Sequence, residues 1–210
     1  AAATFTQGLK ADQNHPTLRY NLGITLQADG KLWEAAREFE AALRARPGWI
    51  DALNNLAIVY QRASRLDESL RLFQQILEID PGNPIALNNI GTIYARQGNS
   101  DAALESYTKA PDRSPSYDRA AENIGRLMED DLDTDRAIRT LEDLSAREDV
   151  TPELSYQLGR LMMREGRLDE AVGRLTEASV RRPEDSRTLR SLGEAQFRND
   201  EAEAAQRTYT

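Results

Sequence analysis

The amino-acid sequence predicts an all-α fold, an α-solenoid of stacked helix hairpins, on the strength of two observations. A period of 34 residues runs through the 210-residue chain without an insertion or a deletion. Within each period, apolar or small residues recur at helical spacing in two stretches that a short polar turn separates. A fixed period of this length is typical of solenoids, in which each hairpin completes its core by packing against its neighbours.

The period divides the chain into six repeats that follow a short initial segment. Residues 1–15 have the pattern of the second helix of a preceding, truncated repeat. The six repeats span residues 16–49, 50–83, 84–117, 118–151, 152–185 and 186–210, and the last is cut short. Because terminal repeats of such arrays need a polar outer face, we expect the chain to be a fragment of a longer array.

Each repeat contains two predicted helices, a turn and a closing proline. In the second repeat, Leu53, Leu56 and Tyr60 form the apolar stripe of a first helix, and Phe73 and Ile76 belong to the stripe of a second helix. The turn positions, where a helix end favours a left-handed residue, hold Gly30, Ser64, Gly98 and Gly166. The closing prolines, which cannot continue a helix, are Pro47, Pro81, Pro115 and Pro183.

Small residues recur at two positions of the repeat. The middle of the first helix holds Gly23, Ala57, Gly91, Gly125, Gly159 and Gly193. The start of the second helix holds Ala35, Ala103, Ala137, Ala171 and Ala205. Glycine inside a helix costs roughly 1 kcal/mol relative to alanine, so its recurrence indicates that a neighbouring helix passes close by.

Together these features resemble the tetratricopeptide repeat family over essentially the whole chain. The resemblance rests on the Leu-Gly pairs at Leu22 and Leu158, the tyrosine at Tyr60, the aromatic residue at Phe39, and the closing prolines. It implies a right-handed superhelix of helix hairpins. It also implies a non-catalytic scaffold for protein–protein interaction, which binds a peptide segment or a partner protein in a concave groove lined by the first helices.

Composition excludes several other classes of function. The net charge of −8 argues against a nucleic-acid partner, because such proteins carry clustered basic charge. No apolar run approaches membrane-spanning length, so we expect no membrane insertion. Arg far outnumbers Lys, which hints at a bacterial genome.

The residue inventory also argues against an enzyme and against a cofactor. The chain has no cysteine and a single histidine, so histidine-dependent triads, thiol nucleophiles and the usual zinc sites are unavailable. It has no glycine-rich phosphate loop. His15 lies before Pro16 at the start of a repeat, where we expect an exposed structural role.

An acidic stretch in the fourth repeat has the spacing of a calcium-binding loop. The matching positions are Asp131, Asp133, Asp135, Ile138 and Glu142. Arg136 replaces the glycine that such a loop needs, and the next residue is the repeat's alanine, inside a predicted helix. We therefore interpret the stretch as a solvated turn whose acids favour the start of the following helix.

The end of the third repeat departs from the pattern. Pro111 falls within the expected second helix, which should therefore end near Lys109. We predict an irregular joint from Pro111 to Pro115, with a local change of pitch that divides the array into two halves. In the fourth repeat Leu132 takes the place of the turn glycine and Asp149 that of the closing proline.

The predicted peptide-binding groove is lined by residues of the first helices. A series of asparagines, whose amides both donate to and accept from a peptide backbone, comprises Asn21, Asn55, Asn89 and Asn123. The neighbouring positions in the first half of the chain are Tyr20, Asn54, Ile58, Arg62 and Asn88. Those in the second half are Arg126, Tyr156, Arg160, Met163, Arg164 and Arg198. The asparagines equally suit hydrogen bonds between repeats, and the arginines equally suit solvated surface positions.

Two alternatives to a simple scaffold stay open. The chain is the substrate-recruiting arm of a larger enzyme, such as a glycosyltransferase, if catalytic activity lies in another domain. Alternatively, it self-associates through the exposed ends of the array. In every case the sequence predicts a protein or peptide partner and leaves its identity open.

Overall fold

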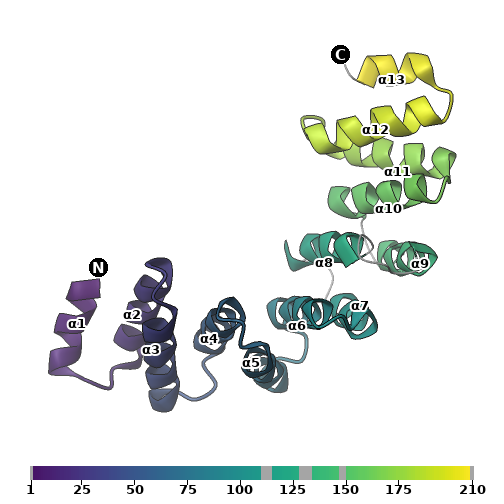
Figure 1. Ribbon diagram of the computed structural model, residues 1–210. Coiled ribbons are helices and arrows are strands. Elements are labelled where there is room, and N and C mark those ends of the chain that lie inside the picture. The colour runs from purple at the N-terminus through teal and green to yellow at the C-terminus, as the bar shows by residue number, and fades with distance from the viewer. Residues whose placement is uncertain (1, 110–114, 128–133, 147–149, 209–210) are drawn as a thin grey trace. The chain divides into compact units, whose positions relative to one another are not determined.

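The computed structural model describes residues 2–109, 115–127, 134–146 and 150–208. These residues form thirteen α-helices, and none of them lies in a strand, so the predicted all-α repeat fold is confirmed (Figure 1). By its internal contacts the chain divides into an N-terminal part, residues 1–97, and a C-terminal part, residues 98–210. We describe each part by itself.

The N-terminal part is a series of antiparallel helices, each of which packs against the next. They are α1 (Ala2–Ala11), α2 (Pro16–Ala28), α3 (Leu32–Ala45), α4 (Ile50–Arg62), α5 (Leu66–Ile79) and α6 (Pro84–Arg96). The first helices α2 and α4 also contact each other directly. The core of this part contains Phe39 and Phe73, both fully buried.

The C-terminal part continues the same alternation of first and second helices. It contains α7 (Ser100–Thr108), α8 (Pro115–Leu127), α9 (Thr134–Ser145), α10 (Pro152–Arg164), α11 (Leu168–Arg181), α12 (Ser186–Arg198) and α13 (Ala202–Thr208). Here α10 contacts both α8 and α12, so three first helices lie side by side. This arrangement brings their side chains onto a shared face.

Turns between first and second helices have the predicted left-handed backbone. Gly30, Gly98 and Gly166 have φ values of +76°, +75° and +78°. Ser64 and Asp200, at the same place in their repeats, have φ of +60°, although neither is glycine. Leu132 lies outside the described residues. The period therefore fixes a backbone conformation even where the residue type is unfavourable.

Several of the first helices begin with a proline or with a side-chain cap. Proline, which suits the first position of a helix, starts α2, α6, α8 and α10. His15 accepts a hydrogen bond at Nδ1 from the backbone N–H of Leu18, 3.4 Å away, and so caps α2. Asn83 and Thr151 cap α6 and α10 in the same way. The predicted structural role of His15 is confirmed.

The recurrent small residues allow close packing inside each hairpin. A Cβ atom on Gly23 would lie 2.7 Å from Cε1 of Phe39, and one on Gly159 would lie 2.5 Å from Cγ of Leu175. Ala35 and Ala171 are fully buried at the start of the second helices. The predicted close approach of neighbouring helices is therefore confirmed at these positions.

The third and fourth repeats differ from the prediction in part. Helix α7 ends at Thr108, as the proline at position 111 predicts. Residues 110–114 lie outside the described residues, as does Asp149. Helix α8 begins at Pro115, whereas we predicted that this proline closes the third repeat and that the fourth begins at residue 118. Proline is favoured as the first residue of a helix, so it can begin α8 early.

The register of α8 nevertheless follows the period. Ala120, Ala121 and Ile124 are buried at the positions expected for a first helix. The predicted joint from Pro111 to Pro115 lies almost wholly outside the described residues. By its internal contacts the chain divides between Gln97 and Gly98, before α7.

Two absences concern the described residues alone. None of their helices combines the length and the apolar character needed to cross a bilayer. They also contain no group of three or more side chains suited to hold a metal ion. Asp131 and Asp133 of the calcium-like spacing lie outside them, and Ile138 is buried within helix α9, where a calcium loop would require irregular backbone.

Candidate functional site

Two adjoining hollows lie on the face formed by α8, α10 and α12. The first has a volume of about 260 Å³ and is lined by Gly125, Gln157, Arg160, Leu161, Met163, Arg164 and Arg198. The second has a volume of about 220 Å³ and is lined by Glu122, Arg126, Tyr156, Gln157, Arg160 and Arg187. Because Gln157 and Arg160 line both, the hollows form one continuous surface, which we call the arginine face.

The structure brings together the groove residues predicted for the second half of the chain. All six line the arginine face, namely Arg126, Tyr156, Arg160, Met163, Arg164 and Arg198. They come from three helices and reach a shared surface because first helices occupy equivalent positions in successive repeats. Asn123, also predicted, lies half-buried on α8 and is not among the lining residues of either hollow.

The arginine face is basic although the chain is acidic. Within the part of the chain that the structure describes, five arginines line it, and Glu122 is the single acidic lining residue. Glu122 accepts a hydrogen bond from Nη2 of Arg126 at 2.8 Å, one turn away on α8. Of the described residues, three arginines and no acidic residue line the first hollow. The local charge thus opposes the net charge of −8.

Tyr156 lines the second hollow and is largely buried. Only 8% of its surface is exposed, and the guanidinium carbons of Arg160 and Arg187 lie 5.8 Å and 5.3 Å from the centre of its ring. Cations at this distance from an aromatic ring are attracted by its quadrupole. The ring therefore helps to hold two arginines in place beside the hollow.

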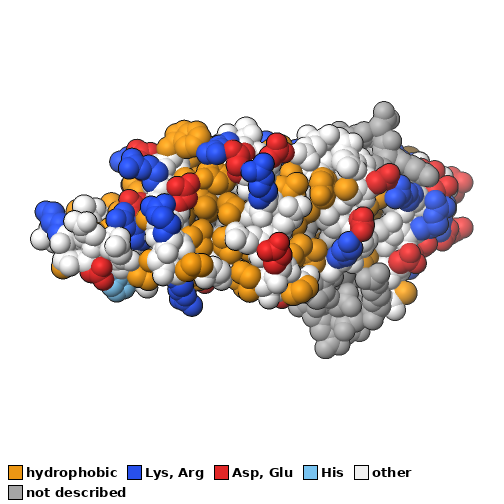
Figure 2. Space-filling view, turned by 90° about the horizontal axis from the view of Figure 1, so that it is seen from below, with side chains coloured by type: hydrophobic (Ala, Val, Ile, Leu, Met, Phe, Trp, Pro, Cys, Tyr) orange, Lys and Arg blue, Asp and Glu red, His pale blue; other side chains and the backbone are white. Residues whose placement is uncertain are grey.

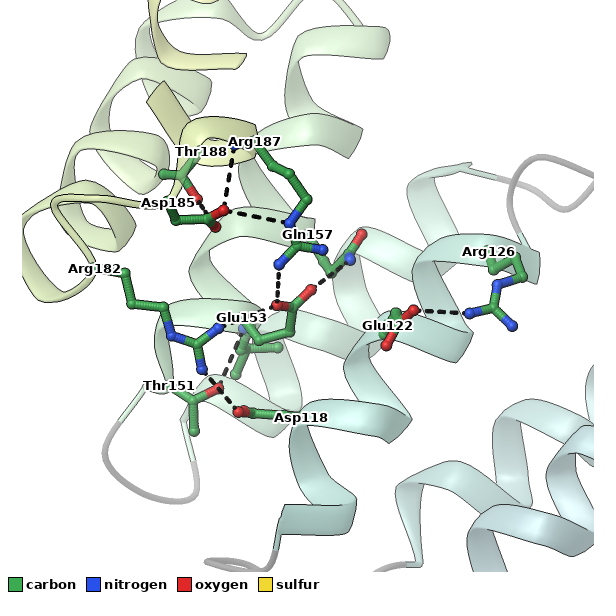
Figure 3. A network of polar contacts seen from close by, with 11 residues as sticks. Asp118, Glu122, Arg126, Thr151, Glu153, Gln157, Arg182, Asp185, Arg187 and Thr188 are labelled. Atoms are coloured by element: carbon green, nitrogen blue, oxygen red, sulfur yellow. Dashed lines mark hydrogen bonds and ion pairs between the residues drawn. The ribbon is translucent and has the colours of Figure 1, made fainter. Parts of the chain in front are cut away.

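A buried carboxylate, Glu153, binds several polar side chains beside the arginine face (Figure 3). It is 6% exposed and accepts a hydrogen bond from Nε2 of Gln157 at 2.8 Å. It also accepts longer hydrogen bonds from Nη2 of Arg187, at 3.3 Å, and Nη1 of Arg182, at 3.5 Å. Arg182 in turn pairs with Asp118 at 3.1 Å. This network links α8, α10, the end of α11 and α12.

Asp185 forms a second ion pair with Arg187 and caps the N-terminus of α12. Its carboxylate accepts hydrogen bonds from Oγ1 of Thr188 at 2.7 Å and from Nε of Arg187 at 3.4 Å. Burial alone would raise the pKa of Asp185, but these hydrogen bonds and the charge of Arg187 lower it below its ordinary value. The carboxylate therefore stays ionised and keeps Arg187 in place at neutral pH.

The prediction from sequence did not single out Glu153, Arg182 or Arg187. The equivalents of Glu153 in the N-terminal part are exposed, so its position in the repeat indicates a solvated residue. One signal was present, since Arg182 and Arg187 flank the closing proline of the fifth repeat and lie near the start of the next first helix. Only the packing of three helices shows that both arginines reach the same buried acid.

The residues predicted for the N-terminal groove lie on its first helices. They are Tyr20 and Asn21 on α2, Asn54, Asn55, Ile58 and Arg62 on α4, and Asn88 and Asn89 on α6. Figure 2 shows one face of the molecule, on which basic and acidic side chains are interspersed among hydrophobic ones.

Several of these amides are engaged in the fold. Nδ2 of Asn55 donates to Oη of Tyr20 at 3.1 Å and to the backbone carbonyl of Asp51 at 2.8 Å. Nδ2 of Asn89 donates to the carbonyl of Ile85 at 2.8 Å. Asn88 is 6% exposed, so it offers almost no surface to a ligand, contrary to its predicted place in the groove. The period gives the direction of a side chain, whereas its depth depends on the neighbouring helices.

Comparison with known proteins agrees with this architecture. Two family models described as tetratricopeptide repeat match the chain, one over residues 50–114 and the other over residues 1–49, 123–175 and 156–209. No curated protein sequence was found to match.

Solved structures share the fold. PilF of Pseudomonas aeruginosa is 19% identical with a TM-score of 0.63, and the match covers 92% of this chain and 88% of that one. PilW, described as a type IV pilus biogenesis factor, is 21% identical with a TM-score of 0.62 over 92% and 90%. YrrB, described as having an unusual peptide-binding site, is 17% identical with a TM-score of 0.59 over 91% and 98%.

At these identities the solved structures establish the fold alone. The family models, however, cover more than half of the chain. The chain therefore belongs to the tetratricopeptide repeat family, whose fold serves as a scaffold for protein–protein interaction.

Proposed function

We propose that the chain is a non-catalytic scaffold that binds a peptide segment of a partner protein on the arginine face. The observation that carries this proposal is the pair of adjoining hollows on α8, α10 and α12. Each is smaller than the 300–1,000 Å³ typical of small-molecule sites. Two small hollows in series suit successive side chains of an extended peptide better than one compact ligand.

The chemistry of the lining residues also favours binding over catalysis. Arginine, glutamine, tyrosine and methionine provide hydrogen bonds and apolar contact, and arginine and tyrosine are common in the centres of protein interfaces. Glu122, the only acidic residue among the described lining residues, pairs with Arg126. None of the described lining residues is a histidine, cysteine or serine that would form a nucleophile–base pair.

The relative YrrB supports the class of ligand, because its structure is described as having a peptide-binding site. In the N-terminal part, Asn21, Asn55 and Asn89 remain candidates for contacts with a peptide backbone. Asn89 donates one N–H to its own helix and keeps a second N–H and its oxygen, whereas Asn55 donates twice within the fold and keeps its oxygen.

A peptide selection tests the proposal. A randomised peptide library displayed on phage is selected against the chain, and the affinity of labelled winners is measured by fluorescence anisotropy. Replacing Met163 and Arg198 together by alanine should weaken the winners about tenfold, the usual effect of losing an interface contact. Arg139→Ala, an exposed change on the second helix α9, is the control and should have no effect. Winners that bind both variants equally would contradict the proposal.

A further inference from the structure

We infer that the peptide held by the arginine face is acidic, with carboxylate side chains bound by Arg160, Arg164 and Arg198 and an apolar side chain against Met163. This inference rests on the proposed function and specifies the ligand of the same site. Its basis is the charge of the lining residues, their fixed positions and the apolar surface between them.

Charge complementarity is the first argument. Among the described residues, three arginines and no acidic residue line the first hollow, and three arginines and Glu122 line the second. A guanidinium group matches a carboxylate with two parallel hydrogen bonds, which gives both affinity and direction. A partner segment rich in Asp and Glu is therefore the occupant whose charge this surface complements.

The face is also organised in advance. Glu153 and Asp185 hold Arg187, and Glu153 holds Gln157. Gln157 lies directly against Gly125, where a Cβ atom would come within contact distance of its side chain. Groups fixed before binding lose less conformational entropy when the ligand arrives. Because two carboxylates bind Arg187, we assign it a positioning role.

Apolar surface distinguishes a peptide from other anions. Met163 and Leu161 line the first hollow. Phe197, at the position of Met163 in the next repeat, is 69% exposed. Inorganic phosphate would leave this apolar surface uncovered. A long nucleic acid would meet the field of a chain with net charge −8, whereas a short acidic segment needs only the local basic surface.

The test uses the peptides selected against the full chain. Asp and Glu should be enriched among the winners, together with an apolar residue beside them. One selected peptide is also made with asparagine in place of its aspartates, and the chain is also made with Arg160→Gln and Arg164→Gln together. Anisotropy measures the affinity for each change alone and for both combined. Each alone should weaken binding about tenfold, as expected for hydrogen bonds between charged groups. The combined loss should be clearly smaller than the product, because both changes remove the same contacts.

Controls separate charge from folding. Arg139→Gln on α9 should leave the affinity unchanged, and thermal unfolding should confirm that the Gln variants keep the fold. The asparagine peptide tests the contact even where a protein variant fails to fold. Affinity should also fall as salt is raised from 50 to 500 mM, since these charges are partly exposed.

The outcomes distinguish this inference from the proposed function. Winners that are neutral, yet lose affinity when Met163 and Arg198 are changed, would overturn the acidic ligand and leave peptide binding in place. Winners indifferent to that change, or no winners, would overturn both. Multiplicative losses in the double-change experiment, or equally tight binding of a short polyuridine oligonucleotide, would also overturn the acidic peptide as the ligand.

Discussion

Glu153 shows how a single buried charge can be tolerated in a thin helical structure. Its carboxylate is surrounded by Gln157, Arg182 and Arg187, which replace the water it loses. Glu153→Ala should lower the free energy of unfolding by about 1–3 kcal/mol, less than for a fully buried pair because both arginines are partly exposed. Urea unfolding measures this change.

Glu122→Ala is the matched control for that prediction. Glu122 pairs with Arg126 on the surface of α8, and both side chains are about half exposed. Exposed pairs of this kind contribute at most about 0.5 kcal/mol. If the two alanine variants unfold at the same urea concentration, the predicted contribution of the Glu153 network to stability is wrong.

Ser64 is the second residue whose environment makes a prediction. Its φ of +60° is a conformation that costs free energy for every residue except glycine. Ser64→Gly should therefore raise the free energy of unfolding by about 0.5–1 kcal/mol. The reverse change, Gly30→Ser, should lower it by a similar amount, because that position has φ of +76° and open space around it. Thermal unfolding tests both predictions. If both changes raised the stability, or both lowered it, the proposed backbone strain at Ser64 would be contradicted.

At the scale of helices, two glycine-to-alanine changes should have opposite effects, because one glycine lies in the close contact of α2 with α3 and the other has open space around it. Gly23→Ala places a methyl group 2.7 Å from the Phe39 ring and should destabilise by about 1–3 kcal/mol. Gly173→Ala, on helix α11 with nothing within 4 Å, should stabilise by about 1 kcal/mol through helix propensity. Equilibrium unfolding of both variants provides the comparison, and a stabilised Gly23→Ala would refute the packing.

The contact between α3 and α4 predicts a loss of stability at high pH. Oη of Tyr60 donates to Oε1 of Glu40 at 2.5 Å, and burial, followed by the neighbouring Glu40, raises the pKa of Tyr60 to about 12. The ordinary value is about 10. A raised pKa stabilises the fold fully below pH 10, and that contribution is lost as pH rises from about 10 to about 12.

Tyr60→Phe isolates this effect from other groups that titrate in the same range. Between pH 9 and 12, the stability of the wild-type chain should fall more steeply than that of the variant in urea unfolding. Parallel pH profiles would show that the Tyr60–Glu40 hydrogen bond contributes nothing to the pH dependence.

The period accounts for most of what could be predicted about these elements. It gives the left-handed turns at Gly30, Ser64 and Gly98, because every hairpin reverses at the same point. It does not give the early start of α8, because Pro115 suits both the end of one repeat and the beginning of a helix. Local sequence leaves that choice open.

At the scale of the whole molecule, the candidate site was predictable in part. The arginines and Met163 share a face because equivalent positions of successive first helices lie side by side. The depth of Asn88 and the partners of Glu153 depend on side chains far apart in sequence, with Arg182 paired to Asp118 over 64 positions. No periodic pattern carries such pairings. The division after Gln97, before α7, was likewise not visible in the sequence.

The central claim is that the arginine face of the C-terminal part binds a peptide. The chain has three methionines, of which Met163 lines the first hollow while its neighbour Met162 is 1% exposed. Methyl NMR of the ¹³C-methionine-labelled chain, titrated with a selected peptide, therefore reads this face directly. We predict a saturable shift of the Met163 methyl signal that is clearly larger than that of Met162. An unchanged Met163 signal at saturating peptide would contradict the claim.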